Sequence, residues 1–264
     1  MEAVFSGKVT KPLSPLQDSS VYGPIHSRRL GNSLGINPLP LTYKLCDFDC
    51  VYCQYGWTPA KGNGEKIKRA GELLDEIETA FRHHQKAGTV LHCITLAGNG
   101  EPTIHPDFLA LVRGLVRLRD EIYPGVKIGV LSDSSQAHRP EIREALGLLD
   151  ERYMKLDTGD EALHAEINKP RGNFNFQRML DSLKTLDDIV IQSLFMAGSH
   201  ENTRPGQIEK WIQAVAYVRP REVQVYTVDR GPADPGLEKV SPEKLHEIAA
   251  ACQAQTGIPS VVFD

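Results

Sequence analysis

From about residue 33 onwards, the chain alternates between two hydrophobic periodicities. Apolar residues three and four positions apart, such as Leu73, Ile77 and Phe81, are typical of amphipathic helices. Short apolar runs such as residues 189–195 (IVIQSLF) are typical of buried strands. The predicted helices span residues 72–86, 107–119, 140–148, 176–186, 207–218 and 242–255. The predicted strands span residues 33–38, 90–97, 126–131, 153–156, 189–195, 222–228 and 259–263.

This alternation predicts an α/β fold with a parallel sheet built from right-handed crossovers. We expect a partial (β/α)6 TIM-like barrel over residues 32–235, with a doubly wound open sheet as the alternative. Residues 1–31 are rich in proline, serine and glycine and are expected to form an irregular N-terminal arm. Residues 236–264 are expected to be a short C-terminal helix–strand extension of the same domain.

Composition narrows the class of protein. Hydrophobic residues make up 41% and charged residues 24% of the 264 residues, which is ordinary for a globular protein and excludes a disordered one. The formal net charge of −4 argues against a surface that coats nucleic acid. There is no run approaching ~18 apolar residues and no pattern of a signal peptide, so we expect a cytoplasmic protein without a membrane span.

Three of the five cysteines lie close together, in the loop LCDFDCVYCQYG. Cys46, Cys50 and Cys53 have the spacing C-x3-C-x2-C, which suits three ligands of a 4Fe–4S cluster and leaves one iron open. The alternative is a structural zinc site completed by Cys93 or a histidine. Cys93 and Cys252 each sit within an apolar pattern and are expected to be buried small hydrophobic residues.

Polar residues follow four successive predicted strands. The cysteine loop follows the first, residues 98–102 (GNGEP) the second, Ser132 and Asp133 the third, and Asp157 the fourth. In parallel barrels, ligand-binding groups lie at the carboxyl ends of the strands. The sequence therefore predicts one active site that these segments share.

The cysteine loop, with Tyr52 before its last cysteine, resembles that of the radical S-adenosylmethionine (SAM) superfamily. GNGEP is similar to the Gly-Gly-Glu element of that superfamily, with Asn99 in place of the second glycine. The strings GPIHSRRLGNSLGINPLP, KLCDFDCVYCQYG, LAGNGEPTIHP and VYTVDRGPAD resemble a bacterial and archaeal subgroup related to wyosine-forming tRNA enzymes. Together they span roughly residues 22–235.

The resemblance implies a 4Fe–4S cluster whose open iron binds the amino and carboxylate groups of SAM. The turn at residues 98–101 would face the methionine ammonium, Ser132 and Asp133 the ribose, and Tyr52 the adenine. The residues expected to bind SAM are Tyr52, Gly98, Asn99, Gly100, Glu101, Ser132, Asp133 and Asp157.

Several of these residues also have an alternative, purely structural role. Glu101 is otherwise a solvated loop carboxylate, Ser132 and Asp133 cap a turn, and Tyr52 packs against the cysteine loop. Lys155 and Asp157 are two positions apart and point the same way, either as a structural ion pair or as a substrate contact. In the strand at residues 189–195, Gln192 or Ser193 is expected to face the barrel interior.

The implied reaction is reductive cleavage of SAM followed by hydrogen abstraction from a substrate, a small molecule or a peptide. The implied partner is a reductant such as flavodoxin or ferredoxin. One alternative is a tRNA-modifying enzyme of the wyosine type. The chain has no cysteine before Cys46 to hold the second cluster of those enzymes, although a basic strip is present: Arg28, Arg29, Lys61, Lys66, Lys68 and Arg69. The other alternative is a non-catalytic iron–sulfur protein for electron transfer or sensing.

Substrate is expected to enter at the rim near Arg28, Arg29 and Arg230. The planar guanidinium of arginine bonds two oxygens at once and suits a phosphate or carboxylate. Alternatively, these arginines pair within the fold with acids such as Asp229 and Asp234.

Overall fold

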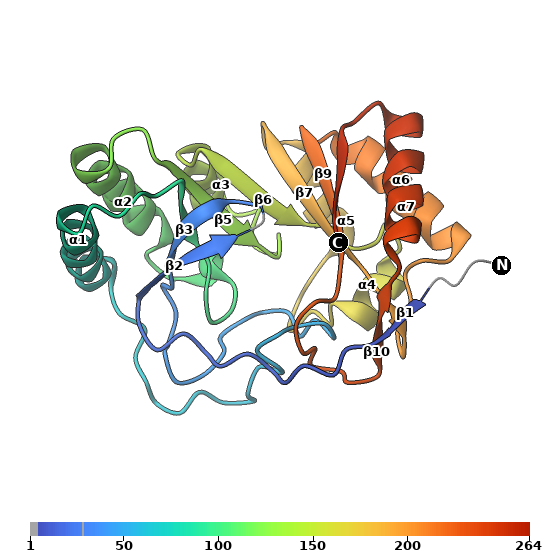
Figure 1. Cartoon of the computed structure of the whole chain (residues 1–264), viewed down its shortest axis with the longest axis horizontal. Helices are drawn as coiled ribbons and strands as arrows, with labels where there is room; N and C mark the ends of the chain where they lie inside the picture. The colour runs from blue at the N-terminus through green and yellow to red at the C-terminus, as the bar shows by residue number, and fades with distance from the viewer. Residues whose placement is uncertain (1–4, 28) are drawn as a thin grey trace.

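The computed structural model describes residues 5–27 and 29–264, and its main feature is one curved, eight-stranded sheet. The strands are β2 (Val21–Ser27), β3 (Gly31–Ile36), β4 (Cys93–Leu96), β5 (Lys127–Ser132), β6 (Glu151–Lys155), β7 (Ile189–Phe195), β9 (Glu222–Thr227) and β11 (Ser260–Phe263). Their order across the sheet is β11-β9-β7-β6-β5-β4-β3-β2 (Figure 1). Neighbouring strands are parallel except β2 and β3, which pair antiparallel. Within the described residues no ladder joins β2 to β11, so the sheet is an open, partial barrel.

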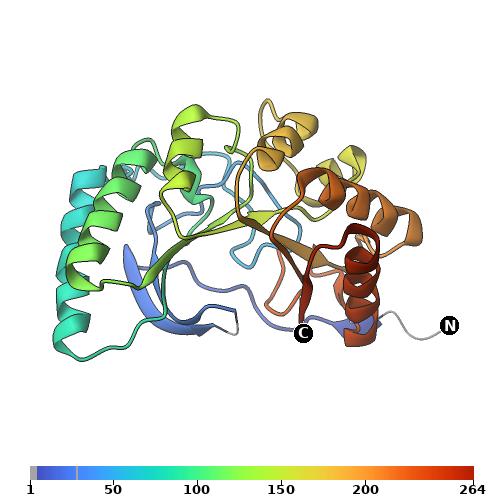
Figure 2. The ribbon, with the colours of Figure 1, turned by 90° about the horizontal axis from the view of Figure 1, so that it is seen from above.

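The helices cover one face of this sheet. They are α1 (Ala70–Lys86), α2 (Phe108–Ile122), α3 (Pro140–Gly147), α4 (Glu161–Ile167), α5 (Phe176–Lys184), α6 (Pro205–Val218) and α7 (Pro242–Thr256), with a 3-10 turn η1 (Pro102–Ile104). Figure 2 shows them in an arc along the convex side, while loops occupy the concave side. The doubly wound alternative is therefore wrong, because that fold needs helices on both faces.

Alternation along each strand separates the core from the concave face. In β3, Leu34 and Ile36 are fully buried in the core between sheet and helices. Ser33 and Gly35 point the other way and line a cavity. In β7, Gln192 lines that cavity, whereas the Ser193 hydroxyl accepts a bond from the Trp211 indole of α6, at 2.9 Å. The expectation that at least one of this polar pair faces inward is confirmed.

The predicted helices and the seven predicted strands are all present, and the α/β partial barrel is confirmed. Residues 5–27 are less irregular than the arm expected over residues 1–31. Their strand β2 extends the sheet, and β1 (Phe5–Lys8) pairs with β10 (Leu237–Val240), which also pairs with β8 (Ala197–Gly198). The short α4 was not predicted either.

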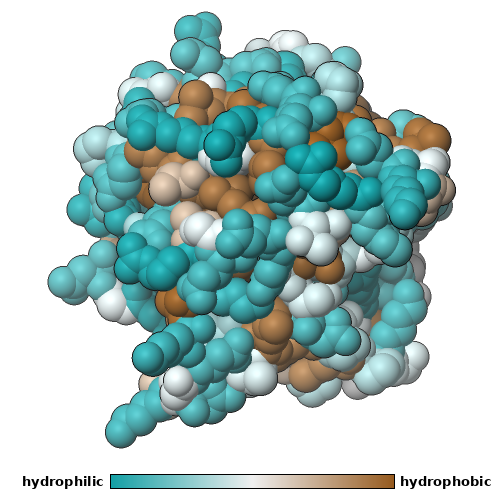
Figure 3. Space-filling view, turned by 90° about the vertical axis from the view of Figure 1, so that its left-hand side faces the viewer, coloured by the Kyte–Doolittle hydropathy of each residue, from teal (hydrophilic) through white to brown (hydrophobic). Residues whose placement is uncertain are grey.

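The outer face over α1 and α2 is largely hydrophilic, with small hydrophobic patches between the polar side chains (Figure 3). This is the polar side of amphipathic helices whose apolar side is buried against the sheet. No helix in the described part of the chain has the length and apolar character needed to cross a bilayer.

We predict that Phe81→Ala destabilises the fold by about 3–5 kcal/mol, because Phe81 is fully buried in the main core. The matched control is Val90→Ala, since Val90 is 68% exposed and its truncation should change stability by less than about 0.5 kcal/mol. Urea unfolding midpoints, measured at equal m-value, check both. Equal midpoints for the two variants would contradict the assignment of Phe81 to the core.

Candidate active site

A cavity of about 560 Å³ opens at the carboxyl ends of the parallel strands. Its walls combine the cysteine loop, the turn after β4 and the ends of β5, β6 and β7. The predicted site residues that line it are Cys46, Cys50, Cys53, Tyr52, Gly98, Gly100, Glu101, Ser132 and Asp133. Asn99 and Asp157 are buried behind its walls instead.

The cysteine loop is bonded directly to the turn that follows β4. The Leu45 N–H donates to the Asn99 carbonyl at 2.8 Å, and the Glu101 N–H donates to the Leu45 carbonyl at 3.1 Å. Leu45 and Gly100 thereby form an isolated parallel bridge. Because Cys46 is the next residue, this pairing sets where the first cysteine lies.

Gly100 is required by that pairing. Its φ of +145° lies in the region that favours glycine, and a Cβ at this position would lie 1.7 Å from the Leu45 carbonyl oxygen. Gly98 has a φ of +152°, and a Cβ there would lie 2.3 Å from Asn37 Oδ1. Both glycines are thus needed for the packing of the protein itself, whatever ligand the turn also meets.

The other side of the cysteine loop is held by α4 and the residues after it. The Val51 N–H donates to the Ile167 carbonyl at 2.9 Å, and the Arg171 N–H donates to the Asp47 carbonyl at 2.8 Å. An antiparallel bridge joins Phe48 to Pro170. The loop is therefore anchored along both flanks, although most of it lacks regular secondary structure.

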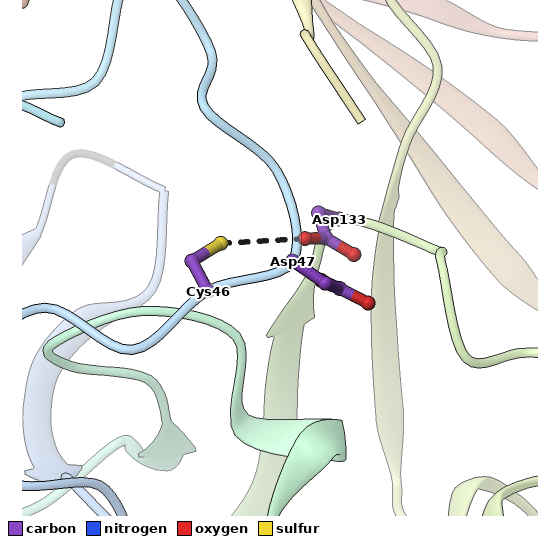
Figure 4. Close-up of side chains that lie close together, drawn as sticks. All are labelled: Cys46, Asp47 and Asp133. Carbon is purple, nitrogen blue, oxygen red and sulfur yellow. Dashed lines mark hydrogen bonds between the residues drawn. The ribbon is translucent and has the colours of Figure 1, made fainter. Parts of the chain in front are cut away.

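The spacing of the sulfur atoms bears on which metal group the loop holds. Among the described residues, only Cys46, Asp47 and Asp133 form a group of candidate ligands whose atoms lie within 4.8 Å of one another (Figure 4). The three loop cysteines together do not form such a group. Three thiolates on one zinc ion, at Zn–S distances of about 2.3 Å, would lie within about 4 Å of one another. The wider spacing fits a multi-iron cluster better than a single ion.

Neither distant cysteine completes the set. Cys93 is 4% exposed in β4, where its Sγ lies 3.5 Å from the Ile94 carbonyl oxygen and from Thr95 Oγ1. Cys252 is fully buried in α7. Both are the buried small residues that their apolar surroundings predict.

A buried cation, Lys44, lies beside the loop thiols. Its side chain is 3% exposed, and its Nζ donates to the Gly56 carbonyl at 2.9 Å. Burial lowers the pKa of Lys44, but the three nearby thiols and Asp49 outweigh it, and the net pKa is raised. Burial also raises the pKa of the Cys50 thiol to about 12. Metal ligation requires thiolates, and a fixed positive charge nearby stabilises them.

Glu101 is a buried structural carboxylate, so the solvated alternative is wrong. It is 2% exposed. Its Oε1 accepts from the Thr103 N–H and the Ser132 hydroxyl, each at 3.0 Å, and its Oε2 accepts from the Asp133 N–H at 2.6 Å. Burial, and then the charge of Asp47, raise the pKa of Glu101 to about 7. Glu101 thus joins the turn after β4 to the end of β5.

Ser132 and Asp133 both shape a turn and face the cavity. The Ser132 hydroxyl accepts from the Ser134 N–H at 3.1 Å, and Asp133 Oδ1 accepts from the Ser135 N–H at 2.9 Å. Asp133 Oδ2 also lies 3.5 Å from Cys46 Sγ (Figure 4). Burial, followed by the charges of Asp47 and Glu101, raises the pKa of Asp133 well above its ordinary value.

Asp157 supports the cavity wall from behind. Its carboxylate accepts from the Leu194 N–H at 2.8 Å and from the Tyr52 hydroxyl, and it pairs with Lys155 at 2.7 Å. The predicted pairing of Lys155 and Asp157 is therefore present, with Lys155 lining the cavity and Asp157 buried behind it. Lys155 Nζ also donates to the Tyr226 hydroxyl at 2.7 Å and lies about 5 Å from the Tyr52 and Tyr226 ring centroids (4.9 and 4.8 Å). Lys155 lines the cavity and presents a positive charge to it at the end of β6.

Asn168, which the sequence did not single out, links this network to the cysteines. Its Nδ2 donates to Asp157 Oδ2 at 2.9 Å and lies 3.4 Å from Cys50 Sγ. An asparagine at the end of a short helix carries no signal for such a role. The Asn99 side chain is bonded to the backbone of Gln17 and Pro40, which leaves only the backbone of Asn99 for the SAM contact expected of this turn.

Two of the three rim arginines lie at the cavity mouth, and Arg28 lies outside the described residues. The Arg29 guanidinium sits 4.7 Å from the Tyr226 ring centroid, and Arg230 donates to Gln54 Oε1 at 2.6 Å. Both line the cavity. Asp229 pairs with two lysines, Lys11 and Lys239, so it is not the partner of these arginines.

The basic strip is not a continuous free surface. Lys68 pairs with Glu76 at 2.6 Å and Arg69 pairs with Asp107 at 2.6 Å. Lys61 and Lys66 are exposed and have no ion-pair partner within the described chain.

The chain is similar to several known proteins. The family model of the radical SAM superfamily matches residues 41–204. The chain is 28% identical over 234 residues to a UPF0026 protein of Methanocaldococcus jannaschii, covering 87% of this chain and 70% of that protein. It is 26% identical over 230 residues to a UPF0026 protein of Helicobacter pylori (strain J99), covering 85% of this chain and 71% of that protein. A protein named GTPase Obg from Brachyspira hyodysenteriae is 25% identical over 260 residues, 95% of this chain but 36% of that protein.

Solved structures share the fold at low sequence identity. A radical SAM methyltransferase from Sphaerobacter thermophilus superposes with a TM-score of 0.62 at 16% identity, covering 88% of this chain and 65% of that one. A structure of TYW1 with a lysine-pyruvate adduct bound gives a TM-score of 0.61 at 12% identity, covering 85% of this chain and 74% of that one. This chain thus spans about a third of the protein named Obg (36%) and just under two thirds of the methyltransferase chain (65%).

Enzymes of the matched superfamily use a 4Fe–4S cluster and SAM, and the cysteine loop at residues 46–53 fits such a cluster. The family match covers more than half of the chain, from the loop before Cys46 to the start of α6. The chain belongs to the radical SAM superfamily.

Proposed function

We propose that this protein is a radical SAM enzyme that binds a 4Fe–4S cluster through Cys46, Cys50 and Cys53 and removes hydrogen from a small anionic substrate. One observation carries the proposal. The three cysteines, the turn after β4 and the end of β5 all open onto one cavity of about 560 Å³. A cavity of this size holds a cofactor and a small substrate side by side. When bound, the reduced cluster supplies the electron that cleaves SAM.

The side of the cavity nearest the cysteines suits SAM. Gly98 and Gly100 line it without side chains, so their backbone is open to the methionine end of the cofactor. Ser132 and Asp133 line the same region and offer hydroxyl and carboxyl groups to the ribose. Glu101 fixes the turn after β4 against the end of β5 through its bonds to the Ser132 hydroxyl and the Asp133 N–H. Asn99 and Asp157 then act as positioning residues rather than as SAM contacts.

The side of the cavity toward β6 and β9 suits an anionic substrate. Lys155 lies between the Tyr52 and Tyr226 rings with its charge balanced from behind by Asp157. Arg29 and Arg230 stand at the mouth. A carboxylate or phosphate entering past the arginines meets the lysine as a fixed cation. The surrounding aromatic walls exclude water from the reacting atoms.

The cavity also bears on the alternative functions. An iron–sulfur protein that only carries electrons has no use for a polar cavity beside an open iron. The strip proposed for tRNA is broken by the ion pairs of Lys68 and Arg69. A small-molecule enzyme is therefore the function that we favour.

We predict that the anaerobically reconstituted protein forms 5′-deoxyadenosine from SAM and dithionite, and that Cys50→Ala abolishes it. Cys50 is a proposed cluster ligand, and loss of one of three ligands removes the cluster. Cys93→Ala is the matched control, because Cys93 lies in β4 with contacts of its own. Iron content is measured by colorimetry and 5′-deoxyadenosine by chromatography. Both should stay at the wild-type level in the control. No 5′-deoxyadenosine from a fully loaded wild-type protein would instead support the electron carrier.

Gly100→Ala should lose most of its iron, because the new Cβ would meet the Leu45 carbonyl next to Cys46. Gly71→Ala adds the same methyl group in α1, where nothing lies within 4 Å, and should load fully. Iron per chain and the visible absorption of the cluster are the measurements. Normal loading of Gly100→Ala would mean that the loop and turn are not coupled as the pairing suggests.

Lys155→Met should keep basal SAM cleavage within about threefold but lose stimulation by substrate, since the lysine is proposed to hold the substrate anion. The probe is a cell extract split into a low-molecular-mass filtrate and a retentate, with the filtrate further separated by anion exchange. Stimulation should follow the anionic filtrate and persist in Lys86→Met, a change at an exposed position in α1. Stimulation by the retentate, or by neutral solutes, would contradict a small anionic substrate.

A further inference from the structure

The segment between β1 and β2, residues 9–20, crosses the molecule without regular secondary structure and is called the N-terminal strap below. In Figure 1 it is the dark blue chain that runs along the lower side, from β1 beside β10 to β2 at one edge of the sheet. Strand pairing fixes both of its ends, because β1 pairs with β10 and β2 pairs with β3. Between those ends, the strap contacts three segments that border the active-site cavity.

The first of these segments follows β9. Gly231 lies so close to the strap that a Cβ at this position would be 2.3 Å from the carbonyl oxygens of both Lys11 and Pro12. Lys11 also pairs with Asp229 at 3.2 Å, an exposed contact that adds little stability. Arg230, which lies between Asp229 and Gly231, lines the cavity. A glycine at position 231 therefore lets the strap lie directly against the segment that carries Arg230.

The second segment is the chain after the last cysteine. The Ser14 N–H donates to the Gln54 carbonyl at 2.9 Å. Leu13 lies beside Gly56, since a Cβ on that glycine would be 3.2 Å from Leu13 Cδ1. The Gln54 side chain in turn accepts from Arg230 at 2.6 Å. The strap is thus bonded to two walls of the cavity that are far apart in the sequence.

The third segment is the turn after β4, where the Asn99 side chain holds the strap. The Gln17 N–H donates to Asn99 Oδ1 at 2.7 Å, and Asn99 Nδ2 donates to the Gln17 carbonyl at 2.9 Å. Both backbone groups of Gln17 are therefore bonded by one fully buried side chain. In the Gly-Gly-Glu element that this turn resembles, a glycine stands at this position and has no amide side chain to offer. Asn99 gives this chain an attachment point for its N-terminal segment that the glycine form of the turn lacks.

The Gln17 side chain connects this turn to a further wall of the cavity. Its Nε2 donates to the Tyr55 hydroxyl at 3.0 Å, and both side chains line the cavity. Among the described residues of the strap, Gln17 alone lines the cavity. It joins the turn after β4 to an aromatic side chain that follows the cysteine loop.

We propose that the N-terminal strap is a wall of the SAM half of the cavity, and that Gln17 is a positioning residue that holds the turn at residues 98–101 in place against Tyr55. The inference rests on the function proposed above, which sets SAM against this turn. With the strap in place, little binding energy is lost to ordering the turn. The bonds that place Cys46 run between Leu45 and the turn and do not involve the strap. Displacing the strap should therefore weaken SAM binding and leave the cluster in place.

The first test displaces the strap from the side of Gly231. Gly231→Ala puts a methyl group against the Lys11 and Pro12 carbonyls, and the matched control Gly147→Ala adds the same group at the end of α3, where nothing lies within 4 Å. Neither glycine has a positive φ, so alanine fits both backbones. SAM affinity is measured by anaerobic calorimetry on the oxidised, reconstituted holoenzyme. We expect Gly231→Ala to bind SAM about tenfold more weakly with unchanged iron per chain, and the control to match the wild type.

Equal SAM affinity in these three proteins would overturn the proposal. A lower unfolding temperature in Gly231→Ala without a change in SAM affinity would overturn it too, because the strap would then only stabilise the fold.

A second pair of variants removes the bond inside the cavity. Gln17→Leu and Tyr55→Phe each abolish the hydrogen bond between these two side chains. Each should raise the KM for SAM about fivefold in dithionite-driven formation of 5′-deoxyadenosine, and lower kcat by less. The double variant should have a KM no higher than the larger of the two single values, because the same bond is lost in each. Additive losses would show that Gln17 does not act through Tyr55 and would overturn its role.

Hydrogen exchange gives a readout that requires no turnover. At a SAM concentration about ten times its Kd, exchange of the Ser14 and Gln17 amides in the wild-type holoenzyme should slow about tenfold, because SAM favours the form in which the strap is in place. Amides of α7, whose residues do not line the cavity, should exchange at unchanged rates. Unchanged exchange of the strap amides would contradict the coupling between strap and SAM.

The outcomes separate this proposal from the function on which it rests. If the wild type forms 5′-deoxyadenosine while Gly231→Ala binds SAM as its control does, the strap is not a wall of the SAM site and the enzyme function stands. If SAM affinity depends on the strap but no 5′-deoxyadenosine forms, the enzyme function fails and the wall stands. A reconstituted wild type that binds no SAM would overturn both.

Discussion

The pairing of the Leu45 backbone with the turn at residues 99–101 is the interaction on which the candidate active site depends. The connection between β3 and α1 is long and mostly irregular, and ordering such a segment costs conformational entropy. Two backbone bonds to the turn, and others to the residues after α4, offset that cost at fixed points along the loop. These bonds hold the first cysteine at the carboxyl ends of the strands. Sites that are held in place in this way lose little binding energy to rearrangement.

Buried polar side chains also connect the ends of neighbouring strands to one another and to the cysteine loop. Glu101 connects the end of β4 to the end of β5, and Asp157 connects β6 to β7 through the Leu194 N–H. Asn168 joins Asp157 to the cysteine loop. Buried carboxyl groups are costly unless they are hydrogen-bonded or paired: Asp157 is paired with Lys155, and Glu101 accepts bonds from Thr103, Ser132 and the Asp133 N–H. They act by positioning the groups that face the cavity, which is why a side chain such as Asp157 is buried although it belongs to the site.

The cysteine loop lines two cavities whose surrounding residues differ. The active-site cavity is also lined by glycine backbone, hydroxyl groups and a lysine framed by tyrosines. Lys44 and Cys46 also line a second cleft, of about 530 Å³, together with Asp47 and Arg171.

Much of the fold and of the site could be predicted from local sequence, because periodicity and cysteine spacing are local properties. Strand β7 was predicted to the residue, since a run of five apolar residues interrupted only by Gln192 and Ser193 has few alternatives once both faces are buried. Strand β2 was missed because Gly23 and Pro24 interrupt it, and an edge strand tolerates that interruption with an irregular register. Helix α4 was missed because seven residues provide too little periodicity to stand out.

The tertiary structure alone decided which of the predicted residues face the cavity. Asn99 and Gly100 are adjacent in the sequence, yet one is bonded to the N-terminal segments and the other lines the cavity. Asn168, Lys44 and Lys155 gained their roles from contacts between segments far apart in the chain. Sequence spacing determines the ligands that a single loop can supply. The direction of each side chain, and the charge that it meets, depend on which strands and loops pack against it.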